Sequence, residues 1–167
     1  MSGKIEVIVG KRRLTFAPIV IIIFDVVLIS VFPYIISFFN IPNYPILSLD
    51  PSDLKSNPIL FFVTAVILAP LLETLIFQKF IIIGTHKVLL KLKCEGFIIP
   101  IIISTLVFGI QHLYSIRYLI CGLFVGYLLA LTFVLLYKNK QRSFFITAII
   151  HSIVNLIAFL MEFVFKN

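Results

Sequence analysis

Five long apolar stretches, separated by short polar segments, dominate the pattern of residues along the chain. They are Phe16–Phe39, Ile59–Ile83, Phe97–Leu113, Tyr118–Tyr137 and Phe144–Phe165. A helix needs about 20 apolar residues to cross the hydrocarbon core of a bilayer. Four stretches reach that length, whereas the third rises only about 25 Å at 1.5 Å per residue. The pattern predicts an all-α, polytopic membrane bundle of about five transmembrane helices, with residues 1–167 forming a single membrane domain.

The composition also favours the bilayer as the solvent. Of the 167 residues, 61% are hydrophobic and 13% are charged, with a mean hydropathy of +1.17. A soluble domain carries about a quarter charged residues. The net charge is +7, but the basic residues form short clusters between apolar runs instead of one stripe. We therefore expect membrane lipid as a partner, and no nucleic acid.

The charges of the connecting segments alternate along the chain. Basic clusters are Lys11, Arg12 and Arg13 before the first stretch, Lys87, Lys91 and Lys93 in the second loop, and Lys138, Lys140 and Arg142 in the fourth. The first loop, 40–58, is rich in proline and carries Asp50, Asp53 and Lys55. Because cytoplasmic loops carry the excess of Lys and Arg, we expect a cell-membrane protein with its N-terminus in the cytoplasm and its C-terminus outside.

A few ionisable residues lie inside these apolar stretches, where they are costly and therefore functional candidates. At 1.5 Å per residue, Glu73 lies roughly 15 Å deep, His112 roughly 22 Å and His151 roughly 10 Å, with Asn155 at roughly 16 Å. His151 and Asn155 are four residues apart, so they share one helical face. We expect these four polar groups, from three helices, to converge near the middle of the membrane. Asp25 has no such partner, and we expect it to hydrogen-bond within the bundle or to line a water cavity.

Three short strings carry a family resemblance: LLETLIFQ at 71–78, FGIQH at 108–112 and HSIVN at 151–155. Their order and spacing resemble the three motifs of the CPBP family, the CAAX proteases and bacteriocin-processing enzymes also called Abi proteins. That family pattern is Glu-Glu-x-x-x-Arg, then Phe-x-x-x-His, then His-x-x-x-Asn or Asp. The resemblance covers a core of about 59–165.

The resemblance implies an intramembrane endopeptidase that hydrolyses a peptide bond in a membrane-associated peptide or protein with a glutamate-activated water. It gives Glu73 the role of general base and lets His112 hold the water. His151 and Asn155 would donate hydrogen bonds to the oxyanion, and Phe108 would be a supporting residue. The family site is generally read as metal-free, so the resemblance implies no cofactor.

The first motif departs from the family pattern at two positions. Thr74 stands in place of the second Glu, and Gln78 in place of the Arg. Since both charges are absent together and the positions are four apart, we interpret the exchange as a coupled structural change. A neutral Thr74–Gln78 hydrogen bond would then replace an ion pair, and both residues would support the site.

Three other functions remain open on the sequence. Glu73, His112 and His151 could form a His₂Glu zinc site, although the His-Glu-x-x-His spacing of zincins is missing. The chain could instead be a non-catalytic, bacteriocin-immunity-like membrane protein that binds a peptide on the same scaffold. A proton-coupled carrier is the third, although no inverted repeat is visible.

Two sequence features near the candidate site concern helix geometry. Pro70 removes one backbone donor about a turn before Glu73. The carbonyl freed by that loss could line the site, or the helix could simply kink. Gly122, Gly126 and Gly109 are small residues that suit close packing of helices in a bilayer.

Overall fold

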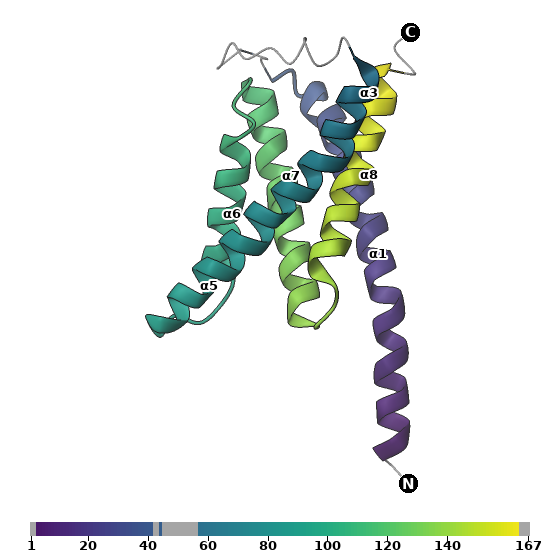
Figure 1. The fold of residues 1–167 in the computed structure, drawn as a ribbon, viewed down its shortest axis with the longest axis vertical. Coiled ribbons are helices and arrows are strands. Elements are labelled where there is room, and N and C mark those ends of the chain that lie inside the picture. Colours follow the sequence, from purple (N-terminus) through teal and green to yellow (C-terminus); the bar gives the residue numbers. More distant parts are fainter. Residues whose placement is uncertain (1–2, 42–43, 45–56, 164–167) are drawn as a thin grey trace.

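The computed structural model describes residues 3–41, 44 and 57–163, with side chains from residue 19 onward. Within these residues the chain forms five helical rods and no strand (Figure 1). The rods are α1 (Gly3–Phe38), the continuous helix Pro58–Lys91, α6 (Ile98–Ile110), α7 (Ile116–Lys138) and α8 (Ser143–Phe163). The predicted all-α membrane bundle is therefore confirmed.

Four of the rods have the length and hydropathy of a membrane-crossing helix, namely Ile19–Phe38 of α1, Pro58–Lys91, α7 and α8. The third rod, α6, has 13 residues and falls below that length. It ends at Ile110, before the predicted end at Leu113, and a tight turn carries the chain into α7. His112 consequently lies in this turn and not within the helix.

The rod Pro58–Lys91, which we call the Glu73 rod, has 34 residues and extends well beyond the predicted 59–83. It consists of α3 (Pro58–Phe61), η1 (Phe62–Leu68), α4 (Ala69–Glu73), η2 (Thr74–Ile81) and α5 (Ile82–Lys91), where η1 and η2 are π-helical. Its start is capped, because the side chain of Asn57 accepts a hydrogen bond from the backbone of Leu60 at 3.1 Å. The rod crosses the face of the bundle obliquely (Figure 1), which accommodates its length.

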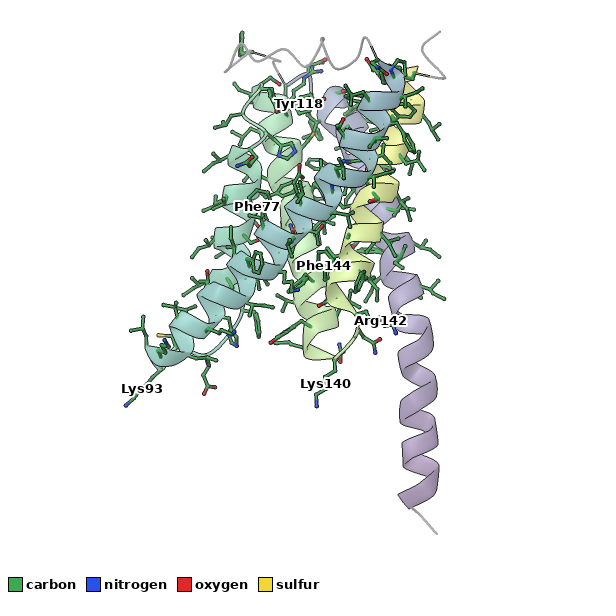
Figure 2. All side chains as sticks on the ribbon, viewed as in Figure 1. Phe77, Lys93, Tyr118, Lys140, Arg142 and Phe144 are labelled. Atoms are coloured by element: carbon green, nitrogen blue, oxygen red, sulfur yellow. The ribbon has the colours of Figure 1, made fainter. Side chains whose placement is uncertain are left out.

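The core joins all five rods. Its largest cluster of buried side chains is Ile29 of α1, Phe77 of η2, Phe108 of α6, Leu128 and Leu129 of α7, and Ile150 of α8. Figure 2 shows Phe77 at mid-height in the bundle. Many large apolar side chains on the outer faces are exposed, as expected for residues that contact lipid acyl chains.

Glycines bring α6 and α7 into close contact, as the sequence predicted. A Cβ on Gly109 would lie 2.4 Å from a side-chain atom of Leu123. A Cβ on Gly126 would lie 2.8 Å from the ring of Phe108. A larger side chain at either position would force the neighbouring side chain to move, so small residues suit this interface.

The basic loops lie together at one end of the bundle. Figure 2 places Lys93 of the second loop and Lys140 and Arg142 of the fourth at the lower end, with Tyr118 near the upper end. This arrangement puts both clusters on one side of a membrane; that this side is cytoplasmic stays a prediction. Most of the first loop, the charges of the N-terminal segment and Lys166 lie outside the residues or side chains that the structure describes.

Candidate functional site

Glu73 and His151 face each other across the contact between the Glu73 rod and α8. The distance between His151 Nε2 and Glu73 Oε2 is 3.6 Å. The His151 side chain is 4% exposed, whereas that of Glu73 is 29% exposed. The pair therefore combines a buried imidazole with a carboxylate that a ligand or water can reach.

The backbone around Glu73 is unusual. Glu73 is the last residue of the short α-helical segment α4, with π-helical turns on both sides. Such turns are rare and occur frequently at functional sites. One of them is tied to α6, because the Ser104 hydroxyl donates to the carbonyl of Phe77 at 3.0 Å. This hydrogen bond helps to fix the rod beside the core.

His112 is held in the turn after α6 by its own backbone and by a glycine. Its Nδ1 lies 2.9 Å from the carbonyl oxygen of Phe108. A carbonyl only accepts, so Nδ1 carries the proton and donates to it, which leaves Nε2 of the neutral ring as an acceptor. A Cβ on Gly122 would lie 2.8 Å from Cβ of His112. The absence of a side chain at position 122 therefore makes room for this imidazole.

The Phe108 ring connects the two histidines. Its centroid lies 4.8 Å from the His112 ring and 5.7 Å from the His151 ring. On its other side Phe108 contacts Phe77 edge to face at 5.5 Å. One buried aromatic side chain thus sets the relative positions of His112, His151 and the Glu73 rod.

Asn155 lies one turn beyond His151 on the same face of α8, as predicted from the spacing. Its side-chain nitrogen donates to the carbonyl oxygen of Ala65 at 2.7 Å. That carbonyl belongs to the Glu73 rod, about two turns before Glu73. Asn155 therefore has a backbone partner that the sequence did not predict, although Pro70 had indicated that a carbonyl in this region could be free.

The predicted hydrogen bond between Thr74 and Gln78 is not formed. Both residues are completely buried. Among the described residues, neither the Thr74 hydroxyl nor either polar atom of the Gln78 amide has a hydrogen-bond partner. The same holds for the Thr147 hydroxyl and for Nδ1 of His151 on the facing helix α8. The exchange therefore leaves both side chains buried, with no hydrogen bond between them.

Asp25 and Lys79 are further charged residues within the apolar rods. Asp25 is 3% exposed and accepts a hydrogen bond of 2.5 Å from the Thr132 hydroxyl of α7. It therefore hydrogen-bonds within the bundle, which is one of the two roles predicted for it. Lys79, which the sequence pattern did not single out, places its ammonium group 5.4 Å from the centre of the Phe144 ring. Its signal in the sequence was a lone lysine on an apolar helix.

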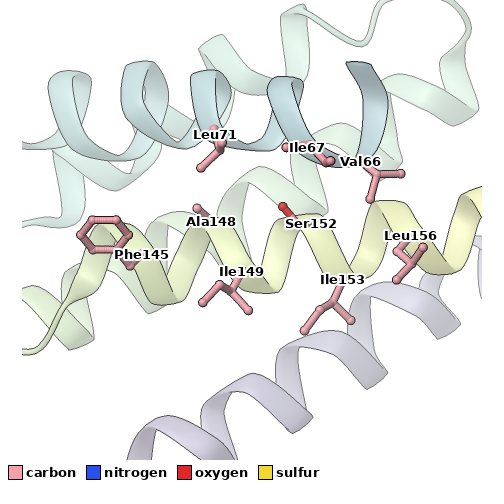
Figure 3. Close-up of a pocket in the computed structure, with 9 residues that line it drawn as sticks. All are labelled: Val66, Ile67, Leu71, Phe145, Ala148, Ile149, Ser152, Ile153 and Leu156. Carbon is pink, nitrogen blue, oxygen red and sulfur yellow. The ribbon is translucent and has the colours of Figure 1, made fainter. Parts of the chain in front are cut away.

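The described residues include no group of three or more His, Cys, Asp and Glu side chains close enough to hold a metal ion. They do include a groove of about 270 Å³ between the Glu73 rod and α8 (Figure 3). It is lined by Val66, Ile67, Leu71, Phe145, Ala148, Ile149, Ser152, Ile153 and Leu156. Its lining is almost wholly apolar and contains neither Glu73 nor His151, so the groove is separate from the polar cluster.

Comparison with known proteins adds a family to this geometry. No curated protein and no solved structure matches the chain significantly. The profile of one protein family, described as type II CAAX prenyl endopeptidase Rce1-like, matches residues 55–157. The match covers the Glu73 rod, α6, α7 and most of α8, and includes all three motifs. Because it spans more than half of the 167 residues, the chain belongs to the Rce1-like family of type II CAAX prenyl endopeptidases.

Proposed function

We propose that this protein is an intramembrane glutamic endopeptidase that hydrolyses a peptide bond in a membrane-associated peptide. The observation that carries the proposal is the pairing of Glu73 with His151 at 3.6 Å in a largely apolar bundle. A reachable carboxylate beside a buried imidazole is expensive to keep within a bilayer. It is also what acid–base hydrolysis requires.

Glu73 is the proposed general base. Its carboxylate would take a proton from a water molecule while the water oxygen bonds to the scissile carbonyl carbon. When the carbon–nitrogen bond of the tetrahedral intermediate breaks, the same proton would pass from Glu73 to the leaving amine. The partial exposure of Glu73 supports this role, because both water and substrate must reach it.

The two histidines would perform complementary tasks. The hydrogen bond from Nδ1 to Phe108 leaves Nε2 of His112 as an acceptor, so it could hold the second hydrogen of the attacking water. His151 would present a proton on Nε2 to the oxyanion that forms at the scissile carbonyl. The Asn155 amide donates one of its two N–H groups to Ala65, and the proposal assigns the oxyanion to His151.

The family indicates the class of substrate to test. We propose a CAAX-type peptide that carries a prenyl group, presented from the surrounding lipid. The large exposed apolar surface of the helices suits a substrate that arrives through the membrane and not from water.

A second candidate, a membrane protein that binds a peptide without cleaving it, is favoured by one specific observation. Thr74 and Gln78 replace two of the three charged residues of the first family motif and lack hydrogen-bond partners among the described residues. A chain that has lost this charge pair could keep the scaffold and the binding surface. The two functions differ in whether Glu73 must accept a proton.

The decisive experiment measures cleavage of a prenylated CAAX peptide by the purified protein in liposomes. Glu73→Gln keeps the size of the side chain but cannot take a proton, so we expect cleavage to be abolished. The matched control Glu95→Gln changes an exposed loop carboxyl and should retain full activity. If Glu73→Gln cleaves the peptide like wild type, the catalytic proposal is wrong.

The same assay separates the glutamic enzyme from a zinc enzyme. A metal-free site keeps its activity in the presence of a chelator. A zinc site loses activity and regains it when zinc is added back. Loss followed by recovery would replace the glutamic mechanism with the zinc alternative.

A further inference from the structure

The hydrogen-bond ladder of the Glu73 rod lacks one donor just before the candidate site. In the π-helical segment η1, backbone N–H groups bond to the carbonyl five residues earlier, and the N–H of Ala69 donates to Thr64 in this way. The next donor in this ladder would be residue 70, and its acceptor would be Ala65. Residue 70 is proline and has no N–H. The carbonyl of Ala65 therefore receives no hydrogen bond from this ladder.

Asn155 supplies the missing donor from another helix. Its side-chain nitrogen lies 2.7 Å from the carbonyl oxygen of Ala65, although the two residues are 90 positions apart in the sequence. A backbone carbonyl left unpaired in an apolar environment is costly, so this contact has a clear energetic role. Pro70 thus removes one hydrogen-bond donor from the ladder, and Asn155 replaces it. We call Pro70, Ala65 and Asn155 together the hydrogen-bond unit.

This unit lies next to the candidate catalytic pair. Pro70 precedes Glu73 by three residues, and Asn155 follows His151 by four. The rod and α8 are consequently joined twice, once between Ala65 and Asn155 and once between Glu73 and His151. Two neighbouring contacts fix how far one helix can slide or rotate against the other. Without the first contact, the separation of 3.6 Å at the second is no longer enforced.

We propose that Asn155 is a positioning residue, which acts on the reaction by holding the proline-opened backbone of the Glu73 rod. This inference rests on the proposed function, since it is the reaction of Glu73 that Asn155 would support. Asn155 thereby gains a role that differs from the one its motif predicted. Pro70 becomes a residue on which that role depends.

A double-mutant cycle tests the proposal. Pro70→Ala restores a backbone N–H, so the ladder no longer needs a donor from α8. In the wild-type background we expect Asn155→Ala to lower kcat for the prenylated CAAX peptide by about 10²-fold with KM little changed, because the base is displaced. In the Pro70→Ala background the same substitution should lower kcat less than about threefold. His151→Ala is the matched control, and its cost should be equal in both backgrounds.

Equal costs of Asn155→Ala in the two backgrounds would overturn the proposal, because an oxyanion donor is needed whether or not the ladder is complete. The thermal unfolding midpoint of the four proteins in detergent provides a readout without activity. Asn155→Ala should lower this midpoint in the wild-type background and change it little with Pro70→Ala. If no variant cleaves the peptide but this coupling is present, the hydrogen-bond unit stands and the protease assignment fails. If neither activity nor stability shows coupling, the unit itself is refuted.

Discussion

Asp25 and Glu73 are two carboxyl groups within the apolar helices, and their surroundings are very different. Asp25 of α1 is 3% exposed and accepts a hydrogen bond from the Thr132 hydroxyl. Glu73 keeps 29% of its side chain exposed and has a histidine nitrogen 3.6 Å away. The first group is enclosed and hydrogen-bonded, whereas the second is partly exposed and faces an imidazole.

This difference distinguishes a carboxyl that supports packing from one that could take part in a reaction. A carboxyl that serves packing is best fully enclosed and hydrogen-bonded, as Asp25 is. A carboxyl that must exchange a proton with water needs access, and Glu73 retains it. The family match points the same way, because it begins at residue 55 and therefore includes Glu73 but not Asp25. Depth in the membrane alone would not have distinguished the two residues.

Substitutions that neutralise Glu73 and Asp25 in turn should give the largest difference in cleavage activity. Glu73→Gln should lower kcat/KM for the prenylated peptide by at least about 10³-fold, since a general base contributes about 10²–10⁴-fold. Asp25→Asn keeps an acceptor for Thr132 and should remain within about threefold of wild type. The measurement is peptide cleavage in liposomes, normalised to folded protein. An equal loss in both variants would mean that Asp25 also takes part in the reaction.

A pair of glycine substitutions should have the next largest effect. Gly122→Ala places a methyl group 2.8 Å from Cβ of His112, so the imidazole must move. We expect a loss of about 10²-fold in kcat, the usual cost of misplacing a group by about 1 Å. In the control Gly84→Ala the new methyl group meets no atom within 4 Å, and activity should be unchanged. Unchanged activity in both variants would show that the position of His112 does not matter.

Much of the fold and part of the site follow from local sequence rules. Apolar runs of sufficient length predict the helices, since a bilayer requires internally hydrogen-bonded backbone. The spacing of His151 and Asn155 predicted their shared face. The juxtaposition of Glu73 and His151 was expected because the rise per residue places both side chains near the middle of the membrane. These rules depend only on neighbours in the sequence or on the solvent.

What the sequence did not predict depends on contacts between helices. The Glu73 rod continues to Lys91 because it crosses the bundle obliquely and extends beyond the apolar stretch. The partner that Asn155 finds in Ala65 exists only once α8 lies beside the rod. The π-helical turns were not predicted either. The sequence also did not predict that Thr74 and Gln78 are buried without hydrogen-bond partners among the described residues. A separation of four residues along a helix does not determine whether two side chains meet.

Ser104 and Thr74 both carry a fully buried hydroxyl, and their substitution should have smaller effects, mainly on stability. Ser104 donates to the carbonyl of Phe77 at 3.0 Å, whereas the Thr74 hydroxyl is among the described polar atoms without a partner. Ser104→Ala leaves that carbonyl without its donor, and we expect a loss of about 1 kcal/mol in the free energy of unfolding. Thermal or denaturant unfolding in detergent measures it. A variant as stable as wild type would indicate that the π-helical turn finds another donor.

Thr74→Val should have the smallest effect of all, and its sign is informative. Valine has nearly the same shape as threonine and removes a hydroxyl that, within the described part of the chain, bonds to nothing. Replacing an unpaired buried polar group by an apolar group of the same shape is nearly neutral or stabilising. We therefore expect the free energy of unfolding to stay within about 0.5 kcal/mol of wild type or to rise, with kcat changed by less than about threefold. If Thr74→Val instead abolishes cleavage in a folded protein, position 74 has kept the chemical importance of the glutamate it replaces. Thr74 would then belong with Glu73 among the reacting groups and not with Asp25 among the structural ones.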